Sequence, residues 1–142
     1  MKTFNILTHP LLLITSFLFI LISGEHLGGF YLMYILIALP HGGIHSLLAL
    51  TGIVLLVCSY SKYKSANKIF LIPTLDILGV SCMAFSLFFF FHRDKRGYND
   101  GTFEQLVPQI TLVLFSLLSL LFIIKNVARI SKKYPGKVFS HF

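Results

Sequence analysis

Four long apolar runs, separated by short polar breaks, constrain this chain more than any other feature of its sequence. The runs cover residues 6–23, 30–61, 69–92 and 105–124 of the 142-residue chain. About 20 consecutive apolar residues can cross the roughly 30 Å hydrocarbon core of a bilayer as a helix. The chain has 56% hydrophobic and only 12% charged residues, whereas soluble domains carry roughly 25% charged residues. This composition excludes an ordinary soluble enzyme, a disordered chain and a nucleic-acid-binding domain, and it predicts an integral membrane protein.

The second run is too long for a single crossing. As one unbroken helix, residues 30–61 would measure about 48 Å at a rise of 1.5 Å per residue, which exceeds the hydrocarbon thickness. A proline and two glycines at 40–43 weaken helix continuity near its middle. We therefore expect a short interfacial or re-entrant helix over residues 30–39 and a span over residues 44–61. The alternative is one strongly tilted and kinked helix through the whole run.

The predicted fold is an all-α membrane protein that forms a single domain over residues 1–142. It is a four-transmembrane-helix bundle, with the short interfacial or re-entrant helix 30–39 before the second span. The four spans are predicted at residues 6–23, 44–61, 69–92 and 105–124.

Each predicted span carries one face of small and weakly polar side chains at helical spacing. Such residues mark the faces on which membrane helices pack, because they allow close approach and hydrogen bonds. The expected faces are Thr8, Leu12, Thr15 or Ser16, Phe19 and Ser23 in the first span; Gly42, Ser46, Ala49 and Gly52 or Ile53 in the second; Asp76, Gly79, Cys82 or Met83 and Ser86 in the third; and Gln105, Gln109, Leu112, Ser116 and Ser119 in the fourth.

Basic residues are distributed unevenly between the two sides of this bundle. The net charge of +7 arises from 12 Lys and Arg residues against 5 Asp and Glu residues. Cytoplasmic loops of membrane proteins carry an excess of Lys and Arg, and anionic headgroups attract them, so nucleic acid is not an expected partner. We expect an integral protein of a bacterial inner (cytoplasmic) membrane, with the N- and C-termini in the cytoplasm. Nine basic residues fall on the side of the termini: Lys2, Lys62, Lys64, Lys68, Lys125, Arg129, Lys132, Lys133 and Lys137.

Polar side chains inside the predicted spans are candidates for function. Asp76 is the one acidic residue within a span, about 10 Å from its cytoplasmic end at helical rise. An ionisable group at such a depth is costly and typically faces the bundle with a partner. Two interpretations stay open: a proton or ion site, or a carboxyl group hydrogen-bonded to Thr, Ser or backbone groups. Gln105 and Gln109 begin the polar face of the fourth span, which serves either a polar pathway or ordinary packing.

Four histidines fall on the non-cytoplasmic side of the predicted bundle. His41 and His45 share a helical face if the helix continues through residues 42–43, while His26 and His92 come from neighbouring helix ends. Neutral imidazole binds Zn, Cu and Fe, so these four residues are candidate ligands of a metal ion or a haem. The alternative is that they cap helix ends and hydrogen-bond to carbonyl groups and lipid headgroups.

The sequence contains no nucleophile–base signature, no HExxH motif and no phosphate-binding loop, which favours a non-enzymatic role. We expect an accessory or stabilising subunit of a larger membrane complex, because the wide Leu, Ile and Phe faces of the helices suit contact with the lipid bilayer or with a larger partner. The expected protein partner is a larger membrane protein or further copies of the chain. One alternative is a small oligomeric transporter or channel that uses Asp76 and the polar face at 105–119. The other is a histidine-ligated metal or haem protein at the non-cytoplasmic face.

Overall fold

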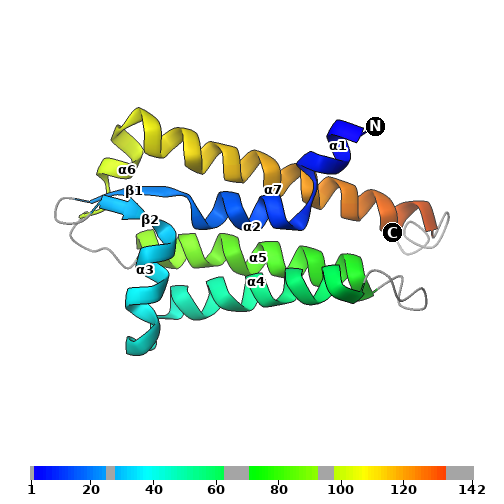
Figure 1. Cartoon of the computed structure of the whole chain (residues 1–142), viewed down its shortest axis with the longest axis horizontal. Helices are drawn as coiled ribbons and strands as arrows, with labels where there is room; N and C mark the ends of the chain where they lie inside the picture. The colour runs from blue at the N-terminus through cyan, green and yellow to red at the C-terminus, as the bar shows by residue number, and fades with distance from the viewer. Residues whose placement is uncertain (1, 25–27, 63–70, 93–97, 134–142) are drawn as a thin grey trace, which may run out of the picture.

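Most of the described chain is helical (Figure 1). The computed structural model describes residues 2–24, 28–62, 71–92 and 98–133. Its elements in chain order are α1 (Lys2–Leu7), α2 (Pro10–Leu18), β1 (Leu21–Ser23), β2 (Gly28–Phe30), α3 (Tyr31–Ala38), the 3-10 helix η1 (Leu39–His41), α4 (Ile44–Lys62), α5 (Leu71–His92), α6 (Gly101–Glu104) and α7 (Leu106–Lys133). Three helices are long and apolar enough to cross a membrane: α4, α5 and α7. The second, third and fourth predicted spans are therefore confirmed as helices of membrane-crossing length.

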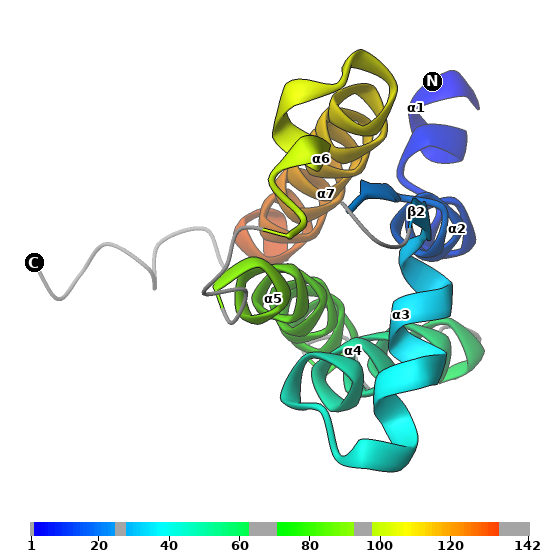
Figure 2. The same ribbon diagram turned by 90° about the vertical axis from the view of Figure 1, so that its left-hand side faces the viewer.

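Four helices, α2, α4, α5 and α7, lie side by side around a shared core (Figure 2). Their main contacts run from α2 to α4, from α4 to α5, from α5 to α7 and from α7 back to α2. The core is apolar, and Phe17, Leu56, Met83 and Phe115, one from each helix, are all buried. We call the end that holds β1, β2, α3 and α6 the hairpin end. The end that holds α1 and the last turns of α7 is the terminal end (Figure 1).

The contact between α4 and α5 depends on two glycines. A Cβ atom on Gly52 would lie 2.7 Å from the carbonyl oxygen of Gly79 and 2.7 Å from Cγ of Met83, so only glycine allows the two backbones to approach this closely. The packing faces predicted for these two spans are confirmed, apart from the exposed Gly42. The buried members are Ser46, Ala49, Gly52, Asp76, Gly79, Met83 and Ser86.

The packing faces predicted for the first and fourth spans are largely wrong. α7 buries Phe115, Leu118 and Phe122, whereas Gln109 and Ser116 of its predicted face are exposed. Neither α2 nor α7 contains a glycine. Their backbones therefore stay farther apart, and large side chains fill the space between them.

The expected first span, residues 6–23, is not one continuous helix, and a fourth span is not confirmed. α1 ends at Leu7, and α2 begins at Pro10, whose missing N–H group is tolerated in a first helical turn. Nδ1 of His9 accepts a hydrogen bond from the backbone N–H of Leu11 at 3.2 Å and so caps α2. α2 then ends after nine residues, and the chain continues in an extended conformation.

The extended segment after α2 is held by its neighbours. β1 pairs antiparallel with β2, and two of its backbone N–H groups donate to threonine side chains. Leu21 donates to Oγ1 of Thr111 at 3.0 Å, and Ser23 donates to Oγ1 of Thr102 at 2.9 Å. Because these hydroxyl groups supply the acceptors that a helix would have supplied, the backbone can leave the helical conformation within the bundle.

The 30–61 run forms two separate helices, as expected. α3 and η1 end at His41, and Gly42 adopts a left-handed conformation with φ 63° before α4 begins. Glycine takes this conformation at little cost, whereas other residues rarely do. The alternative of one long kinked helix through this run is therefore wrong.

Candidate functional site

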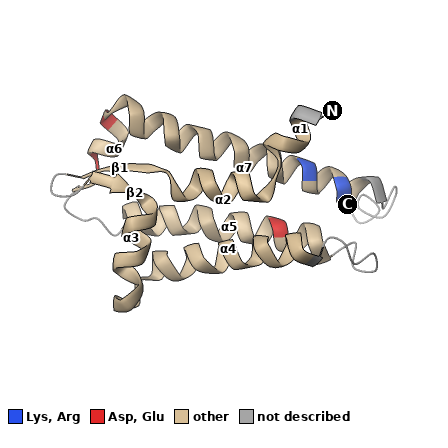
Figure 3. Ribbon diagram, viewed as in Figure 1, with Lys and Arg blue, Asp and Glu red and all other residues tan. Residues whose placement is uncertain are grey.

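Charged residues of the described chain gather toward the two ends of the bundle (Figure 3). Asp100 precedes α6 at the hairpin end, and Glu104 is the last residue of this helix. Asp76 of α5 and the basic residues Lys125 and Arg129 of α7 together line a cavity at the terminal end. This end is therefore the place where opposite charges from different helices meet.

The terminal-end cavity has a volume of about 280 Å³. Polar side chains from four parts of the fold line it, including Thr8 before α2, Ser59 of α4, Asp76 of α5 and Lys125 of α7. Thr8, Ser59 and Asp76 are buried, whereas Arg129 at the lining is exposed. The cavity therefore has a deep acidic side and a basic side that reaches the surface.

Asp76 is only 5% exposed, and it faces the bundle as the sequence predicts. Its carboxyl group lies close to the side chains of Ser59 and Asn126, and Lys125 and Arg129 are near enough to attract it. A buried carboxylate is tolerated when nearby cations and hydrogen-bond donors compensate for its lost hydration. The four partners of Asp76 come from α4 and α7, so this residue ties three helices together.

Lys125 is held in place by Thr8. Its Nζ atom donates to Oγ1 of Thr8 at 2.6 Å, and that hydroxyl group in turn donates to the carbonyl oxygen of Phe4 at 2.7 Å. The chain of hydrogen bonds thus links α7 to the turn between α1 and α2. A flexible lysine side chain is thereby fixed beside the cavity.

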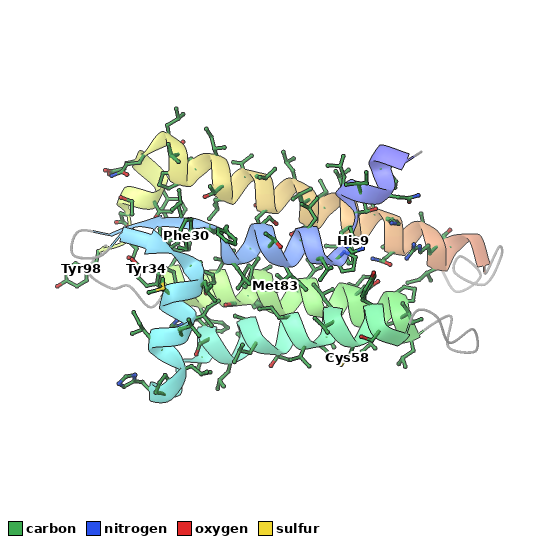
Figure 4. All side chains as sticks on the ribbon, in the orientation of Figure 1. His9, Phe30, Tyr34, Cys58, Met83 and Tyr98 are labelled. Carbon is green, nitrogen blue, oxygen red and sulfur yellow. The ribbon has the colours of Figure 1, made fainter. Side chains whose placement is uncertain are left out.

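His9 forms part of the wall next to this pair (Figure 4). Its ring packs edge-on against Tyr60 of α4, with ring centroids 5.2 Å apart. Its Nδ1 atom accepts a hydrogen bond from the backbone N–H of Leu11 at 3.2 Å, which fixes the orientation of the ring. His9 therefore shapes the wall of the cavity.

The sequence reasoning found Asp76 but missed Thr8, His9, Lys125 and Arg129 as its neighbours. A usable signal was present: Lys125 and Arg129 are four residues apart on one helix face, at the cytoplasmic end of their run, near the depth of Asp76. The contribution of Thr8 and His9 depends on the break between α1 and α2, which the apolar pattern does not reveal.

A second polar group lies at the hairpin end. Oγ of Ser86 donates to the carbonyl oxygen of His45 at 2.6 Å, and it lies 2.8 Å from the hydroxyl oxygen of the buried Tyr31. Burial raises the pKa of Tyr31 well above its usual value. A layer of apolar side chains, including Leu56 and Val80, fills the interior between this group and the terminal-end cavity.

The structure places the candidate histidines apart. The helix does not continue through residues 42–43, so His41 and His45 do not share a helical face. His41 is exposed and its Nδ1 atom lies 3.0 Å from the carbonyl oxygen of Ile37, whereas the ring of His45 packs on Phe90.

His92 stacks on Phe88 with ring centroids 5.3 Å apart. His26 lies outside the described residues. Within the described ranges, no three His, Cys, Asp or Glu side chains are placed so that they could hold a metal ion. The metal or haem site stays a prediction.

The two glutamines of the predicted polar path lie far from Asp76 along the bundle. Gln105 and Gln109 are both exposed at the hairpin end of α7. The side-chain amide of Gln109 donates to the carbonyl oxygen of Phe103, which ties α6 to α7. The structure therefore brings neither glutamine to the cavity.

No protein-family model, curated protein or solved structure matches this chain. The chemistry of the site thus follows from its own residues. A cavity with two cations, one carboxylate and several hydroxyl groups is suited to hold a polar or anionic group by charge-assisted hydrogen bonds.

Proposed function

We propose that this chain is a non-enzymatic accessory or stabilising subunit of a larger complex in a bacterial inner membrane. The observation that carries the proposal is the exposure of Gln109 and Ser116 on α7. With the half-buried Leu112, these residues follow the alternating spacing of three and four residues that lines the seam between two packed helices. Small and polar residues in such a seam allow a second membrane helix to approach closely.

α7 is also the long helix with the most surface available to a partner. Only 22% of the apolar, membrane-length segment of α7 is buried within the protein, compared with 28% for α4 and 39% for α5. Its outermost side chains, such as Val113, Leu117 and Leu120, are apolar and exposed, as contact with lipid requires. The seam that contains Ser116 runs beside this lipid-facing strip. One helix of a partner could pack against the seam while the strip stays in contact with lipid.

A fourth crossing by the N-terminal segment is part of the proposal. The nine residues of α2 rise about 13 Å, and residues 20–23, which lead into and form β1, add about 13 Å. The total of about 26 Å comes close to the roughly 30 Å hydrocarbon thickness. Non-helical backbone is tolerated at membrane depth where protein groups bind it, and Thr111 and Thr102 supply such groups here.

We also propose that the terminal end faces the cytoplasm and that α3 lies at the opposite membrane surface. Basic residues support this orientation, because Lys125 and Arg129 lie at the terminal end, whereas Asp100 and Glu104 lie at the hairpin end. An excess of basic residues marks the cytoplasmic side of membrane proteins. α3 has eight residues, and at about 12 Å it is too short to cross.

Site-directed photo-cross-linking in the native membrane tests the subunit proposal. In a chain with Cys58 and Cys82 replaced by Ala, Ser116→Cys carries the cross-linker, and Leu114→Cys is the matched control. Both positions are exposed, but two residues of a helix point about 200° apart. We expect Ser116→Cys to yield one discrete product with a different membrane protein and Leu114→Cys to yield none.

Deletion of the chain completes this test. If the cross-linked protein is a true partner that the chain stabilises, its abundance in the membrane falls when the chain is absent. Equal products from both positions, a product with a second copy of the chain, or an unchanged abundance of the partner would each contradict the proposal.

A further inference from the structure

The charges around the terminal-end cavity do not cancel. Asp76 contributes one formal negative charge, and Lys125 and Arg129 contribute two formal positive charges. Among the described acidic and basic side chains of the lining, the formal charge therefore sums to one positive unit. A partly buried site with one uncompensated positive charge favours a group with one negative charge.

The depth of the two cations fits the level of lipid phosphate groups. At helical rise, Lys125 lies about 28 Å along α7 from Leu106, and Arg129 lies about 34 Å from it. If Leu106 marks one boundary of the roughly 30 Å hydrocarbon core, Lys125 reaches the other boundary and Arg129 lies among the headgroups. The cavity would then be at the height where phospholipids carry their negative charge.

An apolar surface adjoins the charged cavity. Asn5 and Thr8 line the cavity, and between and beside them α1 exposes Phe4, Ile6 and Leu7, with Ile6 65% exposed. A ligand with an acyl chain gains from such a surface, whereas a free inorganic anion does not. The combination therefore favours an amphiphile over a soluble ion.

We infer that this cavity binds the phosphate group of one monoanionic phospholipid of the cytoplasmic leaflet, with its acyl chains along α1. The volume of about 280 Å³ is roughly nine times the 30 Å³ share of one liquid water molecule, enough for a phosphate and the atoms bound to it. The planar guanidinium group of Arg129 can bind phosphate oxygens with two parallel hydrogen bonds. Lys125, fixed by Thr8 at 2.6 Å, supplies a second positive charge.

Asp76 sets the charge that the ligand must have. Its carboxylate compensates one of the two cations, so the site matches a single negative charge. Replacement by Asn removes this compensation and leaves the cavity with two positive charges. The inference rests on the proposed membrane placement of the terminal end, but it does not depend on the role as an accessory subunit.

Competition between two lipids tests the inference. The full-length protein, purified in mild detergent, is mixed with equal amounts of phosphatidylglycerol and phosphatidylcholine that have the same acyl chains, and bound lipids are counted by native mass spectrometry. We expect the wild type to retain phosphatidylglycerol about fivefold over phosphatidylcholine, the effect typical of one basic residue near anionic headgroups. Arg129→Gln should abolish this preference, and Asp76→Asn should increase it.

Lys133→Gln is the matched control, because it removes the same charge from the last residue of α7, about one helical turn beyond Arg129. It should retain the preference. Thermal unfolding of each variant identifies any loss of folding, and Lys125→Gln replaces Arg129→Gln if the latter does not fold. Equal loss in Lys133→Gln and Arg129→Gln, or an unchanged preference in both, would overturn the inference. Displacement of phosphatidylglycerol by millimolar inorganic phosphate would show that the site takes a free anion and would overturn the lipid assignment.

Discussion

Among single residues, Tyr31 has the most constrained hydrogen-bonding role. Ser86 has one hydroxyl proton, and it donates that proton to the carbonyl oxygen of His45. In the 2.8 Å contact between Tyr31 and Ser86, Tyr31 must therefore be the donor. A phenolate cannot donate, so this chain of hydrogen bonds requires the neutral form of Tyr31.

The raised pKa of Tyr31 predicts a loss of stability at alkaline pH. Above about pH 10, the unfolded chain releases the Tyr31 proton while the folded chain keeps it. The unfolded state then binds fewer protons, so the free energy of unfolding falls by up to about 1.4 kcal/mol per pH unit from this residue. Tyr31→Phe should cost about 0.5–1.5 kcal/mol at pH 7, through the lost hydrogen bond, and should lack this alkaline slope. Thermal unfolding in detergent between pH 7 and 11 measures both, and parallel curves for the two proteins would contradict the assignment.

A candidate site residue could be predicted from the sequence only where its side chain was unusual among its neighbours in the chain. Asp76 was found because a carboxyl group within an apolar run is costly. Lys125 and Arg129 were predicted at the cytoplasmic end of the fourth span, where basic residues are common. Their assignment to the site required the packing of α7 against α5, which a pattern along one helix does not contain.

At the level of elements, the hairpin of β1 and β2 is the feature that the sequence reasoning missed. The apolar residues 19–22 fit a helix and a buried strand equally well, because hydrophobicity alone does not separate the two in a short run. What decides between them is the position of Thr102 and Thr111, about 80 to 90 residues farther along the chain. Boundaries that depend on local residues, such as Pro10 and Gly42, agree better with the sequence pattern.

The threonine contacts predict how the extended segment is stabilised. Thr111→Val keeps the side-chain shape but removes the acceptor for the N–H group of Leu21, which lies 3.0 Å away. An unsatisfied buried N–H group costs about 1–3 kcal/mol, so the unfolding midpoint in detergent should fall and the amide of Leu21 should exchange faster. Thr51→Val is the control, because its hydroxyl group is exposed and bonds only within α4. Equal effects of the two substitutions would mean that Thr111 does not hold β1.

On the scale of the whole molecule, the layer of apolar side chains that includes Leu56 and Val80 separates two polar ends. The distribution of charged residues along the sequence had already distinguished these two ends. The predicted excess of basic residues on the side of the termini corresponds to the terminal end with Lys125 and Arg129. The described acidic residues other than Asp76 lie at α6. The number of crossings was harder to predict, because the first run divides its length between a helix and a strand. A helix and a strand can both bury apolar residues, but a strand rises about twice as far per residue as a helix.

The number of crossings can be measured from the position of the N-terminal segment. If α2 and the extended residues after it cross the bilayer, Asn5 and the end of α7 lie on the same side; with three crossings they lie on opposite sides. In a chain without native cysteines, Asn5→Cys and Lys133→Cys should both react with a membrane-impermeant maleimide only from the cytoplasmic side. Asp100→Cys, beside α6, should react only from the other side. Reaction of Asn5→Cys from the side of Asp100→Cys would show that the first run does not cross, and the bundle would then span the membrane with α4, α5 and α7 alone.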